Sequence, residues 1–410
     1  MSLSPFHAKI DRTVRLFPWY GQLLSDAGID RFAVRSIERL PLMTSELLER
    51  YYYSRELPYA EDGVVGRTTS YRTSGTSTNR RKTIFYSAED ENHYIRIKAE
   101  LFRRIIEPAG ASTALSDMGT GHAAGTALDV FARIGVAADS ISFEQPIGRH
   151  LERLGTLRPH VLYTMPSILD RLLAAAEDDP AGYGLRSVLL VGEIAAPSWR
   201  RSVAERLGLH EERITDTYGS IEIGTIASYS HEHGRYLFAE GIKAEGISAE
   251  ALGGGWEPLQ DGESVLVLTS HVRELFPALR FVTYDVVRDL RPIRVDGKWR
   301  QSFEALVRRI GPELKHGEKI SVYDIENVVY RHLREAHVAI HVRGNKLTVH
   351  IGSRSPVGAA VCESIERELA ERIPEIGAMI RGGILEAIRV VPEEAAYDGP
   401  AIKRKKVFYD

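Results

Sequence analysis

Two stretches of the sequence decide the fold class: VLYTMPSILDRLLAAA at residues 161–176 and SVLLVGEIAAPSWRRSVAERL at residues 187–207. Each opens with a short apolar run, at 161–163 and 187–191, of the kind that forms a buried strand. A turn and then a helical pattern follow, which predicts helices at 166–176 and 198–207. A further helix is expected at 88–106. This alternation of strands and helices predicts an α/β fold with a largely parallel sheet.

A chain of 410 residues exceeds the usual limit for one hydrophobic core, so we expect at least two domains. The charged segment GPELKHGEKIS at 311–321 is typical of an exposed connection. Beyond it, a helix at 322–333, a hairpin that turns at Arg343-Gly344-Asn345 and a helix at 359–373 predict a small α+β domain. The expected division is therefore a large domain at 1–309 and a small mobile domain at 310–410.

Composition argues against several classes of partner. The chain has 53 Lys and Arg against 56 Asp and Glu, so its net charge of -3 offers no field that would attract nucleic acid or an anionic membrane. The single cysteine, Cys362, cannot form an internal disulfide, and no zinc-ligand spacing is present. The apolar stretch near the N-terminus is too short and too interrupted for a signal peptide or a membrane span. We expect a soluble cytoplasmic protein.

A hydroxyl-rich loop, YRTSGTSTNRRK at 71–82, precedes the strand-like segment 83–86. Its hydroxyls surround one glycine and three cations close it, so backbone N–H groups, hydroxyls and positive charge could together bind a polyphosphate. ATP is the natural candidate. The GxxxxGK[ST] spacing of the common nucleotide-binding loop is absent, and a polar surface loop remains the alternative.

Two other segments place a carboxylate where a nucleotide could use it. In DTYGSIEIG, residues 216–224, Tyr218 could stack on a base while Glu222 binds Mg2+. A buried tyrosine beside an ordinary acidic turn would also explain that pattern. In FVTYDV, residues 281–286, Asp285 interrupts a strand-like run and could bind a ribose diol, although a strand-ending turn fits as well.

The C-terminal segment GPAIKRKKVFYD, residues 399–410, contains a basic run between a Gly-Pro pair and a strand-like VFY. Basic runs at chain ends are usually solvated. The flanking residues favour an ordered loop here.

In this order, the four segments resemble the adenylate-forming superfamily of acyl-CoA synthetases, adenylation enzymes and luciferase, and most of all its phenylacetate-CoA ligase branch. The resemblance runs from LPLMT at 40–44 to the terminal lysines. It implies an acid–thiol ligase that uses ATP and Mg2+ to form acyl-AMP and pyrophosphate. A thiol of coenzyme A, or of a phosphopantetheinylated carrier protein, then displaces AMP. It also implies that the small domain reorients between the two steps.

The resemblance implies that Lys403 is the catalytic lysine, with Lys405 and Lys406 as rival candidates. A cation is needed there because it stabilises the negative charge that develops at the α-phosphate. It assigns the β- and γ-phosphates of ATP to the loop of Thr73, Ser74, Gly75 and Thr76. It assigns the adenine to the strand-end turn of Gly192 and Glu193 and to the stacking pair Tyr218 and Gly219. It assigns Mg2+ to Glu222, and the ribose to Asp285 and Arg309.

Two departures from the family pattern qualify this assignment. Ile221 stands where relatives have a Thr or Ser that reaches the α-phosphate, so that contact must be absent or replaced. The cysteine-rich insert of some relatives is missing, so no structural zinc is expected. Lys82 lies near the phosphate loop but has no assigned role.

The segment DMGTGHAAG, residues 117–125, resembles the stretch that lines the acyl pocket in relatives. Its small residues, Gly121 and Ala124 among them, leave room for a flat ring, and His122 could contact the acid. His122 could equally bond a loop backbone. We expect an aromatic acid such as a hydroxybenzoate, with a carrier protein of a siderophore-type pathway as acceptor. An acyl-protein synthetase that uses a fatty acid, and a sensor that binds nucleotide and acid without turnover, remain alternatives.

Overall fold

The computed structural model describes residues 5–53, 68–72, 82–118, 122–253, 256, 258–310, 322–343, 345–353, 355–381, 383, 385–394 and 407–409. The chain forms two compact units, each assembled from separate stretches of sequence. Unit 1 contains residues 1–100 and 218–305, and unit 2 contains residues 101–217 and 306–410. The C-terminal residues thus group with the middle of the chain, and the division at residue 309 stays a prediction.

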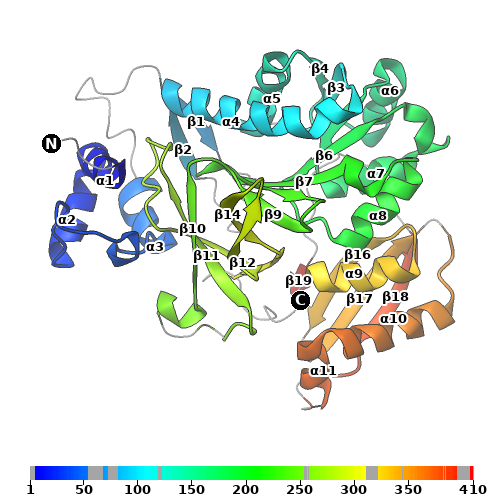
Figure 1. The fold of residues 1–410 in the computed structure, drawn as a ribbon. Coiled ribbons are helices and arrows are strands. Elements are labelled where there is room, and N and C mark those ends of the chain that lie inside the picture. Colours follow the sequence, from blue (N-terminus) through cyan, green and yellow to red (C-terminus); the bar gives the residue numbers. More distant parts are fainter. Residues whose placement is uncertain are drawn as a thin grey trace. The chain divides into compact units, whose positions relative to one another are not determined.

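Unit 1 consists mainly of antiparallel strands (Figure 1). One set pairs in the order β10-β11-β12, a second runs β8-β9-β14-β13, and β1 pairs with β2. These strands are β1 (Thr68–Arg72), β2 (Thr83–Ser87), β8 (Gly224–Ser230), β9 (Arg235–Phe238), β10 (Ile242–Ile247), β11 (Glu263–Ser270), β12 (Phe281–Arg288), β13 (Arg291–Val295) and β14 (Lys298–Phe303).

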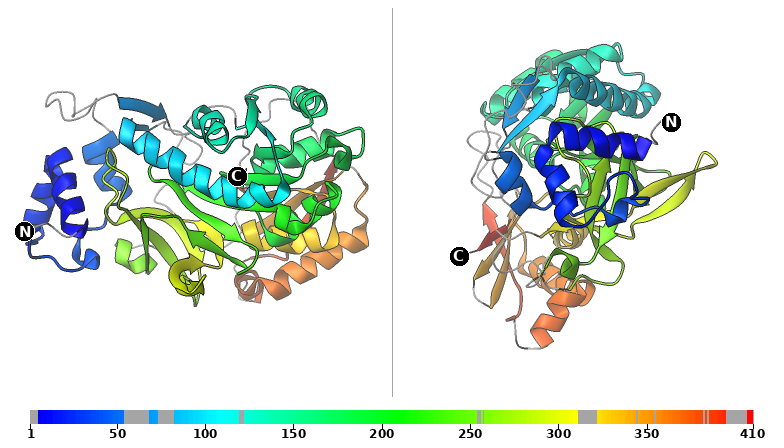
Figure 2. Two further views of the ribbon diagram at one scale, coloured as in Figure 1. Left: turned by 45° about the horizontal axis from the view of Figure 1, so that its top comes forward. Right: turned by 90° about the vertical axis from the view of Figure 1, so that its left-hand side faces the viewer.

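The β13–β14 hairpin extends away from the other strands of unit 1 (Figure 2). Its tip carries Trp299, whose side chain is 65% exposed and receives the Arg294 guanidinium at 5.0 Å from the ring centre. The helices of unit 1 are α1 (Pro5–Leu16), α2 (Pro18–Asp26), α3 (Ser45–Leu48) and the first part of α4 (Ala88–Ile106).

Unit 2 contains the predicted parallel sheet. Its strands lie in the order β4-β3-β5-β6-β7, each parallel to the next. They alternate along the chain with helices, in the sequence β3 (Thr113–Ser116), α5 (His122–Arg133), β4 (Ala137–Ser140), α6 (Ile147–Leu157), β5 (Val161–Thr164), α7 (Pro166–Ala175), β6 (Ser187–Val191), α8 (Pro197–Arg206) and β7 (Ile214–Ser220). The two predicted strands and the three predicted helices are confirmed to within one residue at each end, since α4 also matches its predicted bounds.

The C-terminal part of unit 2 begins after β15 (Ala305–Arg309) and forms its own small sheet, in the order β18-β17-β16-β19. Helices α9 and α10 cover one face of that sheet (Figure 1), where Ile340, Val349 and Ile351 are fully buried. The predicted hairpin and both helices are confirmed, in the order α9 (Val322–His332), β16 (His337–Arg343), β17 (Lys346–Ser353), α10 (Ala359–Arg372), α11 (Pro374–Arg381), β18 (Arg389–Glu394) and β19 (Val407–Tyr409).

The expected α/β class, with a large N-terminal part and a smaller C-terminal part, is confirmed. Among the helices of the described residues, none has the length and apolar character that a membrane span requires.

Candidate nucleotide and acid site

Several of the predicted site residues lie outside the described residues: the phosphate loop Thr73, Ser74, Gly75 and Thr76, the acid-pocket residue Gly121, and the lysines Lys403, Lys405 and Lys406. Their assignments stay predictions. On either side of the phosphate loop, β1 and β2 pair as an antiparallel hairpin. Lys82, which follows the loop, forms an ion pair with Glu49 at 2.8 Å and lies 4.7 Å from the centre of the Tyr53 ring.

Unit 1 brings the predicted adenine and ribose residues together. The Tyr218 hydroxyl donates a hydrogen bond to Asp285 Oδ2 at 2.5 Å, and both side chains are half-buried. An irregularity in β12 sets the direction of the Asp285 side chain. The register between β11 and β12 shifts between Val265 and Val267, and Tyr284 adopts a left-handed φ of 61°. A bulge of this kind re-aims side chains that a regular strand would hold on alternate faces.

The turn that carries Glu222 joins β7 to β8. Gly219 lies where a side chain is impossible, because a Cβ there would meet the backbone oxygen of Gly224 at 2.7 Å. The Ser220 hydroxyl accepts a hydrogen bond from the Ile223 N–H at 3.2 Å. Glu222 is half-buried at the middle of the turn.

Two buried side chains from distant segments also hold this turn, and the sequence reasoning missed both. The Tyr86 hydroxyl donates to the carbonyl of Ile221 at 2.7 Å, and Arg273 Nε donates to the carbonyl of Glu222 at 3.0 Å. The available signal was Arg273 in the segment VRELF at 272–276, where a valine, a leucine and a phenylalanine favour burial, since a buried cation needs buried partners.

In unit 2, Gly192 and Glu193 follow β6 as predicted. Gly192 has a left-handed φ of 83°, which glycine adopts without strain. The Glu193 carboxylate accepts hydrogen bonds from the backbone N–H and the hydroxyl of Ser167, both at 2.8 Å. It therefore caps the first turn of α7. The predicted contact of Gly192 and Glu193 with adenine stays a prediction.

His122 and Ala124 lie in the first turn of α5, which follows the carboxyl end of β3. His122 is buried, and its carbonyl accepts a hydrogen bond from Thr126 Oγ1 at 2.7 Å. Parallel α/β sheets bind their ligands at the carboxyl ends of the strands, so this position suits an acid-binding residue. Ala124 is half-buried.

A second buried histidine lies near the same strand end. His150 Nδ1 is 3.8 Å from Asp117 Oδ2, and both side chains are almost fully enclosed. Burial raises the pKa of Asp117, because the charged form is poorly solvated there. Asp117 belongs to the predicted acyl-pocket stretch, whereas nothing in the sequence indicates His150, which lies 33 residues further along the chain.

The remaining predicted residue, Arg309, is exposed at the end of β15 in unit 2. Its proposed role at the ribose stays a prediction.

Metal-binding side chains do not gather into a ready-made cage in the part of the chain that the structure describes, where no group of three or more His, Cys, Asp or Glu could hold an ion. A single carboxylate on a fixed turn nevertheless suits Mg2+, which usually binds through one or two carboxylates together with substrate phosphates. Glu222 fits that requirement.

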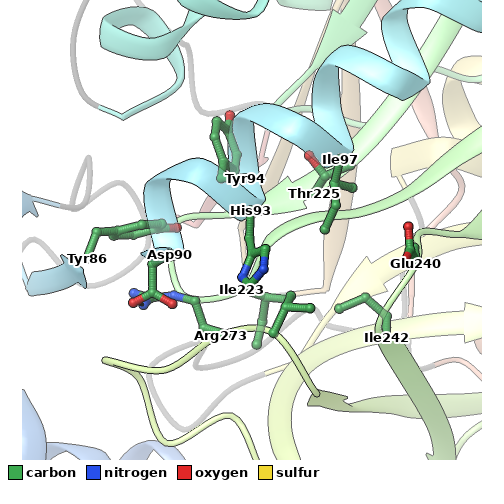
Figure 3. Close-up of a pocket in the computed structure, with 11 residues that line it drawn as sticks. Tyr86, Asp90, His93, Tyr94, Ile97, Ile223, Thr225, Glu240, Ile242 and Arg273 are labelled. Atoms are coloured by element: carbon green, nitrogen blue, oxygen red, sulfur yellow. Dashed lines mark hydrogen bonds and ion pairs between the residues drawn. The ribbon is translucent and has the colours of Figure 1, made fainter. Parts of the chain in front are cut away.

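A small pocket in unit 1 adjoins the turn (Figure 3). Side chains of α4, the start of β8 and the segment at 272–273 line it, and His93 points into its centre. The pocket shares Tyr86 and Arg273 with the set that holds the Glu222 turn.

The sequence was compared with known proteins and families. Residues 315–395 match the model of a family described as the fumarate–diaminopropanoate ligase C-terminal domain. Over 376 residues, 91% of each chain, the sequence is 36% identical to fumarate–(S)-2,3-diaminopropanoate ligase of Enterobacter agglomerans.

Solved structures agree on the fold. A 2-hydroxyisobutyryl-CoA ligase in complex with 2-HIB-AMP covers 99% of this chain and 88% of its own, with a TM-score of 0.75 and 17% identity. An amide bond synthetase from Marinactinospora thermotolerans covers 79% of this chain and 66% of its own, with a TM-score of 0.51 and 16% identity. At such low identities these similarities concern the fold alone.

Proposed function

Because the chain belongs to the adenylate-forming family that includes fumarate–(S)-2,3-diaminopropanoate ligase, we propose that it activates a small carboxylic acid with ATP and joins it to the amino group of an amino acid. That the chain is an adenylate-forming ligase follows from this membership. The identity of the acid and the choice of an amine as acceptor are the proposal. Its main support is the 36% identity to an amide-forming relative over 91% of both chains.

The reaction has two steps. A carboxylate oxygen of the acid attacks the α-phosphorus of ATP, the bond to pyrophosphate breaks, and acyl-AMP forms. The amine nitrogen then attacks the acyl carbon, AMP leaves with the former carboxylate oxygen, and the nitrogen releases a proton to give an amide. The enzyme contributes mainly positioning and charge neutralisation.

The residues of unit 1 fit this chemistry. Tyr218 presents an aromatic ring and Asp285 a carboxylate from adjoining positions, as a nucleoside with its base and ribose diol would require. Glu222 would hold Mg2+, which when bound neutralises phosphate charge. His122 and Ala124 of unit 2 are the candidates for contact with the acid.

The aromatic acid and the thiol acceptor expected from the sequence have less support. The family member with substantial identity is a fumarate–diaminopropanoate ligase by name, so a small dicarboxylic acid and a diamino acid take precedence for this chain. We keep hydroxybenzoates, coenzyme A and a phosphopantetheinylated carrier protein as competing substrates in the test.

The test has two stages. ATP–pyrophosphate exchange is measured with fumarate, other small dicarboxylates, hydroxybenzoates and medium-chain fatty acids. The best acid is then incubated with ATP and either 2,3-diaminopropanoate, other amino acids, coenzyme A or a loaded carrier protein, and the product is identified by mass spectrometry. We expect exchange with a small acid and an amide product.

A thioester product would overturn the amine assignment, and exchange with hydroxybenzoates alone would restore the aromatic acid. Exchange with fatty acids alone would favour an acyl-protein synthetase. Binding of ATP without exchange for any acid would favour a sensor.

A further inference from the structure

We infer that Tyr86 and Arg273 are positioning residues that aim the Glu222 carboxylate. This inference rests on the proposed function, because it takes Glu222 as the residue that holds Mg2+ beside ATP. Both side chains act on the backbone of the turn, and neither is placed in contact with substrate.

Tyr86 and Arg273 bind two consecutive backbone carbonyls of the turn. The carbonyl of Ile221 belongs to the peptide plane before the Glu222 Cα, and the carbonyl of Glu222 belongs to the plane after it. A hydrogen bond from Tyr86 holds the first at 2.7 Å, and one from Arg273 holds the second at 3.0 Å. Peptide units are rigid planes, so fixing both planes fixes φ and ψ of Glu222 and hence the direction of its Cα–Cβ bond.

The two donors are themselves held. Tyr86 is fully buried in β2, and the Arg273 guanidinium lies 3.8 Å from the centre of its ring. Arg273 is also buried and donates further hydrogen bonds to the Asp90 carboxylate and to the carbonyl of Phe85. A guanidinium with three separate acceptors cannot rotate without losing charge-assisted hydrogen bonds.

Asp90 anchors this arrangement to α4. It forms a reciprocal cap with Ser87, in which the Ser87 N–H donates to Asp90 Oδ2 at 3.1 Å and the Asp90 N–H donates to Ser87 Oγ at 3.0 Å. The same carboxylate accepts from the N–H groups of Glu274 and Leu275 at 2.7 and 3.0 Å. Figure 3 shows Tyr86, Asp90 and Arg273 side by side at one end of the pocket.

Tyr52 provides a matched control. It is buried like Tyr86, and its hydroxyl makes two hydrogen bonds in the same region, to the carbonyl of Leu275 at 2.7 Å and from the N–H of Phe85 at 3.2 Å. Neither bond involves the turn at 221–223. Loss of the Tyr52 hydroxyl should therefore affect stability without a direct effect on Glu222.

The experiment compares Tyr86→Phe with Tyr52→Phe in the full chain. We expect Tyr86→Phe to raise the Mg2+ concentration for half-maximal ATP–pyrophosphate exchange by about three- to tenfold, as the loss of one hydrogen bond allows, with the KM of the acid unchanged. Tyr52→Phe should leave the Mg2+ dependence as in the wild type. A second measurement follows Mn2+ binding in the presence of a non-hydrolysable ATP analogue by electron paramagnetic resonance, where Tyr86→Phe should weaken binding by a similar factor.

Arg273→Lys is the second variant, since lysine keeps the charge beside Asp90 but cannot serve all three acceptors. We expect the same shift in Mn2+ affinity. If Tyr86→Phe and Arg273→Lys both match Tyr52→Phe in metal dependence, the positioning role is wrong while the proposed function stands. If the wild type shows no exchange with any acid, the proposed function fails, and this inference fails with it.

Discussion

Tyr218 and Asp285 are 67 positions apart in the sequence, yet they share a hydrogen bond in unit 1. The sequence could flag each one, because Tyr218 adjoins a glycine turn and Asp285 interrupts a strand-like run, where aspartate is disfavoured. It could not predict that they meet, since the meeting depends on a bulge in β12 and on a left-handed tyrosine at 284.

Replacement of Asp285 by Ala should raise the KM of ATP and leave that of the acid unchanged. A charge-assisted hydrogen bond to a ribose hydroxyl contributes about 1.5–3 kcal/mol, which corresponds to at least a tenfold change. Tyr218→Phe, which keeps the ring and removes the hydrogen bond to Asp285, should have a smaller effect. Steady-state kinetics with each substrate varied in turn would check this. An equal rise for both substrates in a folded variant would contradict the ribose role, since Asp285 lies within β12 and the strand-ending turn considered from the sequence is not present.

Replacement of Lys403 by Ala should abolish adenylation while ATP still binds. The resemblance places this lysine at the charge that develops on the α-phosphate, and the loss of such a donor typically lowers the rate by about 10²–10³. Pyrophosphate exchange and equilibrium ATP binding should be measured for the alanine variants of Lys403, Lys405 and Lys406 separately. If only Lys405→Ala or Lys406→Ala is inactive, the catalytic lysine has been assigned to the wrong position.

At the scale of the element, strands and helices were predictable where an apolar run is followed at once by a turn and a periodic pattern. The segments at 161–176 and 187–207 are such cases, and their bounds are correct to one residue. Which side chains cap these helices was not predictable. Glu193 caps α7 from the end of a neighbouring strand, and that contact exists only because β5 and β6 are paired.

Replacement of Glu193 by Ala should therefore destabilise unit 2 by about 1 kcal/mol, the usual effect of losing a helix cap. Glu193→Gln keeps an acceptor oxygen and should lose less. Urea denaturation followed by tryptophan fluorescence would measure both, and adding Ser167→Ala to Glu193→Ala should cost little more because the two residues share one interaction. Unchanged stability in Glu193→Ala would contradict the cap and return the residue to a role at the nucleotide.

Helix α1 docks through Lys9, whose ammonium donates a hydrogen bond to the carbonyl of Arg273. Burial lowers the pKa of Lys9 from 10.5 to about 8, because the charged form is poorly solvated. Between these two pH values the unfolded chain binds more protons at this site than the folded chain. Stability should therefore rise with pH across that window.

The comparison with Lys9→Met isolates this contribution from other groups that titrate at the same pH. The wild type should gain about 1 kcal/mol per pH unit relative to Lys9→Met as pH rises from about 8 towards 10.5. Parallel curves for the two proteins would show that Lys9 keeps its ordinary pKa in the folded state.

At the scale of the whole molecule, the fold class and the superfamily were predictable from four separated segments, and both are confirmed. The preference for an aromatic acid was not a safe inference. It rested on the resemblance to the phenylacetate-CoA ligase branch and on small residues in one stretch, and such residues show that space exists without showing which charges surround it. Asp117, the first residue of that stretch, lies 3.8 Å from the buried His150, and nothing in the sequence indicates that pairing.

The measurement that tests the central claim most directly is the transfer of oxygen from the acid to AMP. The enzyme is incubated with ATP, an amine and the acid that supports exchange, with the acid carboxylate labelled with ¹⁸O. If an acyl-adenylate lies on the path to the amide, the released AMP carries one ¹⁸O atom from the carboxylate, and mass spectrometry will detect it. Label in orthophosphate with ADP as co-product would instead reveal an acyl-phosphate and contradict the account.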